Sequence, residues 1–207
     1  MEIGFGTAAD IALWMALVEK VRWNFPGLER EEDILAHRET VLEFMAENRA
    51  ICAKADGKIV GVLLFSRKHN MLCCMAVDPA YRRRHIATEM FEKMLTLADR
   101  TRDITVTTFR EEDPKGAAPR AFYKRHGFVE GELCMEYMCP SQMFCFAGGD
   151  AAGEQKMTAR RRSFRILVWL YGCALGELRP EPDAAGAVLH AVAAAQQLHV
   201  ALDDGQP

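Results

Sequence analysis

The stretch from residue 71 to residue 99 constrains the fold more than any other part of this 207-residue chain. It begins with a nearly continuous apolar run, Met71–Val77, which is typical of a central strand covered on both faces. Asp78-Pro79 ends the run, and an arginine-rich turn leads into residues 86–99, whose apolar positions recur at helical spacing. A buried strand, a tight turn and a helix in this order predict an α/β domain.

Residues 1–147 as a whole read as alternating strands and helices. Further strands are predicted over residues 3–6, 50–55, 58–65, 104–109, 128–138 and 142–146, and further helices over 7–23, 29–48 and 120–126. Asp56-Gly57 suits a two-residue hairpin turn, in which both central residues need a positive φ. The helix over 29–48 is expected to bury Ile34, Leu35, Val41, Leu42 and Met45.

A change of composition after Gly148-Gly149 marks a boundary. Beyond it come a basic stretch at 160–165, an apolar run, a Pro-Glu-Pro break and an alanine-rich segment. We therefore predict one domain over 1–147 and a C-terminal extension over 148–207, helical and of unknown role. Three explanations of the extension are left open: it packs on the domain, it forms a homodimer, or it reflects a fusion or a change of reading frame in the history of the sequence.

Charge and cysteine usage narrow the classes of function. The formal net charge of −3 gives no reason to expect a nucleic-acid partner. No secretory signal is visible, and the longest apolar run, 166–175, is too short to span a bilayer. Seven cysteines without a C-x-x-C pair predict free thiols in a reducing cytoplasm, and the histidines lack metal-ligand spacing. We expect a cytoplasmic protein without a metal site.

The arginine-rich turn, Arg82-Arg83-Arg84-His85, has the chemistry of an anion site. The first backbone N–H groups of a helix lack partners within it and carry partial positive charge, so a phosphate placed there receives several hydrogen bonds. Arginines at that position add charge and forked donors. A run of three arginines is often only a solvated surface, but here it follows a strand and opens a helix.

At this point the sequence resembles the GCN5-related N-acetyltransferase (GNAT) family. The family's coenzyme motif is Arg or Gln, two variable residues, Gly, one variable residue, then Gly or Ala. Arg82 and Ala87 match its ends, while His85 stands at the glycine position. Tyr123 with Gly127-Phe128 matches a late motif of the family. The resemblance covers about seven-tenths of the chain by element order, and it implies a mostly antiparallel central sheet flanked by helices.

The resemblance implies an enzyme that uses acetyl-coenzyme A as co-substrate and acetylates a primary amine of a small molecule or peptide. Backbone near Ala76 and Val77 would hold the pantetheine arm, and the N–H of Met75 or Ala76 would polarise the thioester carbonyl. The implied coenzyme-binding residues are Ala76, Val77, Arg82, Arg83, Arg84, His85, Ile86, Ala87 and Thr88. Binding is expected to survive the histidine, because the backbone N–H of residue 85 is still available and a protonated imidazole would favour the anion. Histidine tolerates a positive φ at a cost of about 1–2 kcal/mol.

Tyr123 matches the family's tyrosine, whose phenol can protonate the departing thiolate. A phenol with a reference pKa near ~10 is protonated at neutral pH and is available as a donor. The general base stays open, because Met71–Val77 contains no carboxylate. Candidates are Glu111, Glu112, Asp113, His69, His126 and water relays.

The acceptor site is expected beside residues 23–28 and the loop after Phe109, where Trp23 and Phe25 could line it. The acids nearby weakly favour a cationic amine. The family often has asparagine seven residues before its tyrosine, and here that place is Gly116.

Two other functions compete with catalysis. One is a catalytically weak or inactive acyl-coenzyme-A sensor or scaffold, suggested by His85 and the missing strand carboxylate. The other is nucleic-acid binding by the arginines. The acidic net charge of the chain and the lack of stacking aromatic residues beside the arginines both argue against it.

Overall fold

The computed structural model of the protein describes residues 1–149, which form one mixed α/β unit. The strands are β1 (Glu2–Phe5), β2 (Ala50–Ala55), β3 (Lys58–Ser66), β4 (Met71–Val77), β5 (Ile104–Phe109), β6 (Val129–Glu136) and β7 (Cys139–Phe146). The helices are α1 (Ile11–Val21), α2 (Glu31–Ala46), α3 (Ile86–Leu95) and α4 (Ala117–Arg125), with 3-10 turns η1 (Ala8–Asp10), η2 (Arg22–Asn24), η3 (Pro79–Tyr81) and η4 (Pro114–Gly116).

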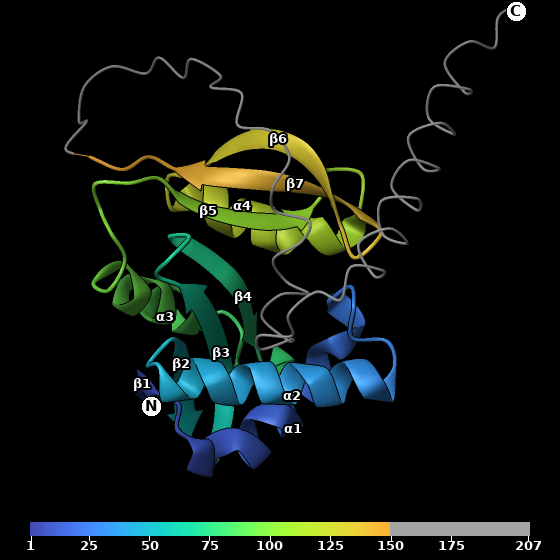
Figure 1. The fold of residues 1–207 in the computed structure, drawn as a ribbon, viewed down its shortest axis with the longest axis vertical. Coiled ribbons are helices and arrows are strands. Elements are labelled where there is room, and N and C mark those ends of the chain that lie inside the picture. Colours follow the sequence, from blue (N-terminus) through green and yellow to red (C-terminus); the bar gives the residue numbers. More distant parts are fainter. Residues whose placement is uncertain (150–207) are drawn as a thin grey trace, which may run out of the picture. The chain divides into compact units, whose positions relative to one another are not determined.

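All seven strands belong to one sheet in the order β1-β2-β3-β4-β5-β7-β6. Every neighbouring pair is antiparallel except β4 and β5, which run parallel (Figure 1). The β2–β3 hairpin turns at Asp56 and Gly57, whose φ angles are 53° and 70°, as the sequence predicts. The mostly antiparallel sheet with flanking helices confirms the predicted fold class.

The strands β4 and β5 diverge almost as soon as they meet. Their ladder consists of Met71 opposite Thr105, whereas β5 pairs with β7 along its whole length. Beside this point the β3–β4 register shifts, so that Cys73 is an extra residue on β4. A bulge bends its strand and adds twist, and it is therefore a physical cause of the divergence. Because the two strands are parallel, Val77 and Phe109 lie at the same, open end.

Two apolar clusters cover the faces of the sheet. One contains buried side chains of α1 and α2, and the other contains those of α3 and α4. The helix α3 approaches β3 closely because Gly61 has no side chain, and a Cβ there would lie 2.8 Å from Ile86 Cγ2. This contact fixes the position of the N-terminus of α3 relative to the sheet.

Several sequence predictions need correction. Leu35 is 65% exposed and does not belong to the buried face of α2. The helix α3 ends at Leu95 and not near residue 99, and α4 begins at Ala117 and not at residue 120. In β4 only Leu72 is fully buried, because a strand that leaves its neighbour cannot be covered along its whole length.

The last hairpin also differs from its prediction. β6 ends at Glu136, and the turn is Tyr137-Met138, both with positive φ. These residues lack the Gly, Asn or Asp that usually marks such a turn in a sequence, so the prediction extended the strand through them.

Two further expectations concern regions beyond the sheet. The extension over 148–207 lies almost wholly outside the described residues. Among residues 1–149, no helix is both long and apolar enough to cross a membrane.

Candidate active site

The arginine turn, residues 82–85, connects β4 to α3 in the way that an anion site requires. His85 is the residue before the first turn of α3 and has φ 61° and ψ 7°, in the left-handed region. Arg83 also has a positive φ, 63°. The position that the family motif gives to glycine therefore has the backbone conformation that favours glycine.

The turn is anchored on both sides. The Asp78 carboxylate accepts a hydrogen bond from the Ala80 backbone N–H at 3.0 Å and forms an ion pair with Lys20 at 2.7 Å. The Lys20 ammonium is the main reason why the pKa of Asp78 lies below its usual value. The Tyr81 hydroxyl donates to Asp56 at 3.1 Å, which ties the turn to the β2–β3 hairpin. The turn is therefore held before any ligand binds.

The charged side chains of the turn are open to a ligand. Arg82, Arg83, Arg84 and His85 are exposed, and no acid among residues 1–149 forms an ion pair with these arginines. Arg84 stacks over the Tyr81 ring, 5.0 Å from its centroid. Three unpaired guanidinium groups beside the N-terminus of a helix suit a phosphate group.

The predicted coenzyme residues that follow the turn have different surroundings. The Ile86 side chain is 1% exposed and packs in the core, so only its backbone N–H can face a ligand. Ala87 and Thr88 are half-buried, and Thr88 Oγ1 lies 3.3 Å from His126 Nε2. Ala76 and Val77 are half-buried on the diverging part of β4. The residues present therefore fit a phosphate-bearing coenzyme, with backbone groups as the main donors.

Tyr123 lies on α4 and packs among the rings of Phe122, Phe128 and Phe144, at centroid distances of 5.5 to 5.8 Å. It is 5% exposed, and burial, together with the nearby Cys74 thiol of β4, raises the pKa of its phenol. The phenol is therefore protonated at neutral pH and lies near the diverging strand. Burial also raises the pKa of the Cys74 thiol to about 12, so that thiol is not a ready nucleophile.

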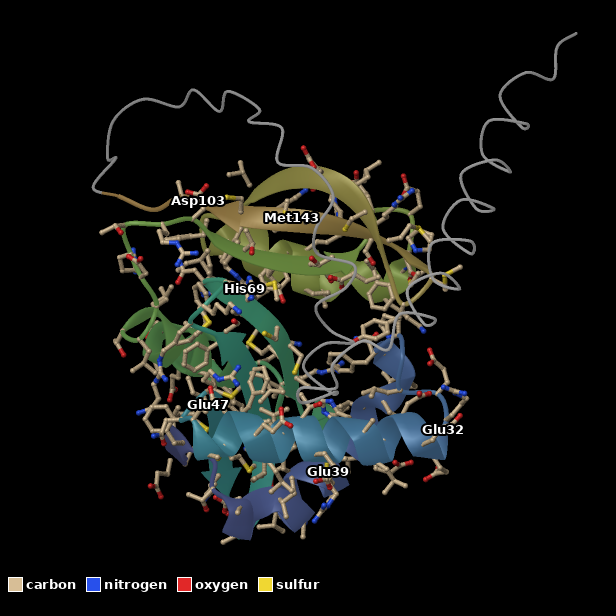
Figure 2. The ribbon with its side chains drawn as sticks, viewed as in Figure 1. Glu32, Glu39, Glu47, His69, Asp103 and Met143 are labelled. Carbon is tan, nitrogen blue, oxygen red and sulfur yellow. The ribbon has the colours of Figure 1, made fainter. Side chains whose placement is uncertain are left out.

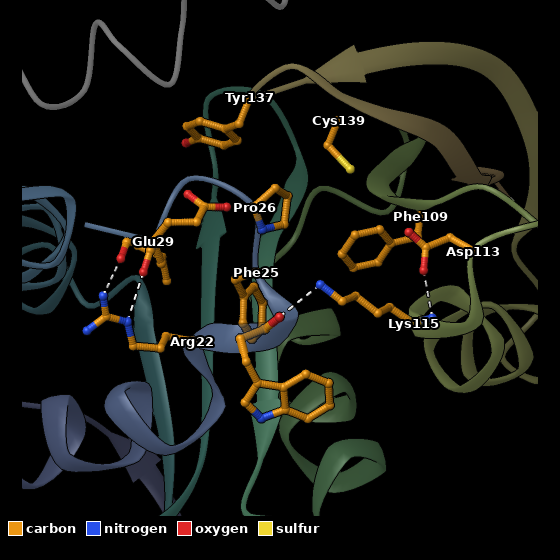
Figure 3. Close-up of a pocket in the computed structure, with 11 residues that line it drawn as sticks. Arg22, Phe25, Pro26, Glu29, Phe109, Asp113, Lys115, Tyr137 and Cys139 are labelled. Carbon is orange, nitrogen blue, oxygen red and sulfur yellow. Dashed lines mark hydrogen bonds between the residues drawn. The ribbon is translucent and has the colours of Figure 1, made fainter. Parts of the chain in front are cut away.

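A pocket of about 470 Å³ lies between three connections that are far apart in the sequence (Figure 3). The α1–α2 connection, the β5–α4 connection and the β6–β7 turn each contribute to its wall. Its lining residues are Arg22, Trp23, Phe25, Pro26, Leu28, Glu29, Phe109, Asp113, Lys115, Tyr137 and Cys139. We call it the aromatic pocket. It is at the location where the sequence places the acceptor, and both Trp23 and Phe25 line it.

The polar groups of the aromatic pocket are largely engaged with the protein. Lys115 Nζ donates to the Trp23 carbonyl at 3.0 Å, and the Asp113 carboxylate accepts from the Lys115 backbone N–H at 2.8 Å. Arg22 donates to the backbone carbonyls of Leu28 and Glu29. Two acids and two bases line the pocket, so their formal charges cancel. Its distinguishing feature is instead a pair of exposed rings, with Trp23 58% and Tyr137 46% exposed.

Tyr137 is held in place by its own turn and by Gly27. The tyrosine has φ 47°, and a Cβ on Gly27, which has φ 82°, would lie 2.6 Å from Tyr137 Cδ1. The ring therefore rests directly on the backbone of the α1–α2 connection. The sequence prediction missed Tyr137 because it placed this residue in a strand.

The structure separates the candidates for the general base. Asp113 lines the aromatic pocket, whereas Glu111 and Glu112 do not. His69 is in the β3–β4 turn, at the end of β4 where the strand meets β5 and opposite to the arginine turn (Figure 2). His126 Nδ1 lies 2.8 Å from the Phe122 carbonyl, and the ring joins α4 to α3. Of these five residues only Asp113 lines the aromatic pocket, and its carboxylate already accepts a hydrogen bond from the Lys115 backbone N–H.

Gly116 explains one departure from the family motif. A Cβ at this position would lie 2.8 Å from the Arg110 carbonyl oxygen, so no side chain fits there. Within residues 1–149, no three His, Cys, Asp or Glu side chains gather as metal ligands.

Residues 46–130 match the family model described as "Acetyltransferase (GNAT) domain". They include the arginine turn and Tyr123. No curated protein matches the chain.

Many solved structures share the fold. A GNAT-family acetyltransferase from Bacillus cereus is similar with 18% identity and a TM-score of 0.56, over 71% of this chain and 96% of that chain. The ribosomal-protein-alanine N-acetyltransferase of Brucella melitensis has 14% identity and a TM-score of 0.57, over 71% and 99%. The PaiA N-acetyltransferase of Thermoplasma acidophilum, solved with coenzyme A, has 15% identity and a TM-score of 0.52, over 69% and 96%.

Proposed function

We propose that this chain transfers an acetyl group from acetyl-coenzyme A to a primary amine bound in the aromatic pocket, in keeping with the match of residues 46–130 to a GNAT acetyltransferase domain. The observation that carries the proposal is that the arginine turn and the aromatic pocket both lie at the open end of β4 and β5, toward which these two parallel strands diverge. A coenzyme held by its phosphates at the turn could lay its arm along β4 and reach the pocket.

The arginine turn, β4 and Tyr123 each have a defined role in the proposed reaction. The helix N-terminus and Arg82, Arg83 and Arg84 bind the phosphates, and the backbone of Ala76 and Val77 holds the arm. The coenzyme supplies the activated acetyl thioester. Tyr123 keeps its proton at neutral pH, because burial raises its pKa, and donates it to the departing sulfur.

The walls of the aromatic pocket indicate the class of amine. Exposed aromatic rings are favourable contacts for flat apolar groups and for cations. Since the charged side chains of the pocket cancel and are engaged with the backbone, the pocket lacks the surplus of acids that a polyamine needs. We propose an acceptor whose amine is carried by an aromatic or apolar body, either a small molecule or a peptide, and not nucleic acid.

The test is thiol release from acetyl-coenzyme A with a panel of amines. We expect arylalkylamines and peptides with an aromatic first residue to have higher kcat/KM than spermidine or an aminoglycoside. Trp23→Ala and Tyr137→Ala should each raise the KM for an arylalkylamine between about two- and tenfold, the value of one aromatic contact. Leu133→Ala truncates a side chain that is 62% exposed on β6 and serves as the control.

The main alternative is an acyl-coenzyme-A sensor or scaffold with the same fold. A sensor would bind acetyl-coenzyme A, measured by calorimetry, without releasing thiol for any amine in the panel. That result would contradict the enzymatic proposal and leave coenzyme binding intact.

A further inference from the structure

Glu136, at the end of β6, is a carboxylate that no sequence motif singles out. The register places it opposite Cys139, and Cys139 and Ser141 lie on one face of β7 because alternate residues share a face. Ser141 in turn is opposite Phe109 of β5. Glu136 therefore belongs to the same face of the sheet as Phe109 and Cys139, two residues that line the aromatic pocket.

The carboxyl of Glu136 reaches across this face to the centre of β5. There the Thr107 hydroxyl hydrogen-bonds to it. Thr107 is two residues beyond Thr105, the point at which β5 leaves β4. The carboxyl is thus between the aromatic pocket on one side and the divergence of the strands on the other. A general base must lie between the acceptor amine and the thioester, and the Glu136 carboxyl has this position between the aromatic pocket and the diverging strands.

The environment of Glu136 also suits a base. The side chain is half-buried, and burial raises the pKa of its carboxyl, while the Thr107 hydrogen bond opposes that effect. A carboxylate with a raised pKa is a stronger base than a solvated one. The titratable and charged groups near it are Cys134 on its own strand, Cys139 opposite it on β7, and Arg110, whose guanidinium donates to the Cys134 and Ser141 carbonyls.

We propose that Glu136 is the general base for the acceptor amine, an inference that rests on the proposed acetyl transfer. The carboxylate accepts a proton from the ammonium group, which leaves a neutral amine and a neutral carboxyl. The amine nitrogen then forms the C–N bond as the C–S bond breaks, and the sulfur takes a proton from Tyr123. The nitrogen then loses its second proton, which restores the Tyr123 phenol, and Glu136 releases its proton to solvent, so each turnover releases one proton overall.

The test compares Glu136→Gln with Glu132→Gln, an exposed carboxyl on the same strand. Glu136→Gln should lower kcat by about 100-fold or more, as expected for loss of a general base, and should remove the fall in kcat/KM at low pH. Its Tm at pH 7 should equal or exceed that of the wild type, because the variant no longer buries a charge. Coenzyme affinity, measured by calorimetry, should stay unchanged, and Glu132→Gln should behave as wild type.

Four results would contradict the inference, and they differ in what they imply. An active wild type with an equally active Glu136→Gln variant, or an unaltered acid limb of its pH profile, removes Glu136 from the mechanism alone. Loss of activity with a lower Tm and weaker coenzyme binding assigns Glu136 a structural role. A wild type that turns over no amine contradicts the proposed acetyl transfer itself.

Discussion

The arginine turn comes from a single stretch of chain, residues 78–88, whereas the aromatic pocket combines residues from three connections that are up to 117 positions apart. The turn presents backbone N–H groups at a helix N-terminus, and its side chains add charge. The pocket instead presents side chains, among them the exposed rings of Trp23 from the α1–α2 connection and Tyr137 from the β6–β7 turn. Under the proposed function, donor recognition would therefore depend on local structure and tolerate changes of side chain, while acceptor recognition would depend on tertiary structure.

Tyr123 belongs to neither region, so its substitution should affect neither binding step. Tyr123→Phe removes the phenolic proton donor and keeps the ring that packs on Phe122, Phe128 and Phe144. We expect kcat to fall by about 100-fold, with the coenzyme Kd and the amine KM changed less than about twofold. Steady-state kinetics and calorimetry measure all three values. Unaltered turnover would remove Tyr123 from the mechanism.

Arg82→Ala should affect the arginine turn alone. Loss of one charge-assisted contact is worth about 1.5–3 kcal/mol, so the coenzyme Kd should rise at least about tenfold. The rise should shrink at high salt, while the amine KM stays the same. Lys68→Ala, at an exposed lysine in the β3–β4 turn, is the control. An equal effect of both changes would mean that general surface charge attracts the coenzyme.

Gly27→Ala should affect the aromatic pocket alone. The new Cβ would collide with the Tyr137 ring and would sit at φ 82°, which costs an L-residue about 1–2 kcal/mol. We expect a several-fold higher amine KM and a lower Tm, with coenzyme affinity unchanged. Gly57→Ala is the matched control, since it also has positive φ, 70°, but has open space around its Cβ. If both variants raise KM equally, displacement of the ring is not the cause.

His85→Gly should have the smallest effect of the four. Glycine relieves about 1 kcal/mol of strain in the left-handed conformation. It also lowers the stability of the folded state by a similar amount, because the unfolded chain gains conformational freedom at a glycine. The free energy of unfolding from urea titration should therefore change by less than about 1 kcal/mol, and coenzyme Kd by less than about twofold. Tenfold weaker binding would show that the imidazole, and not the backbone, contacts the coenzyme.

The same contrast explains what the sequence could predict. The order of elements, the Asp56-Gly57 hairpin and the turn at residues 82–85 follow from short-range patterns, and the structure confirms these elements. Tyr137 could not be predicted because its turn lacks the usual residues and because its contact, the backbone of Gly27, is 110 positions away. Glu136 was missed for the same reason, since its partner Thr107 is on a strand to which β6 is not paired.

The short ladder between β4 and β5 has a consequence for the exchange of backbone amides with solvent. The amides of Cys73–Val77 that point away from β3 have no ladder partner on β5 within the described residues, so they should exchange quickly in the free protein. A coenzyme arm that bonds to this backbone would slow them selectively, while the paired amides of β5 and β7 would keep their protection. Deuterium uptake along β4 would then report the position of the arm residue by residue, before any acceptor is known.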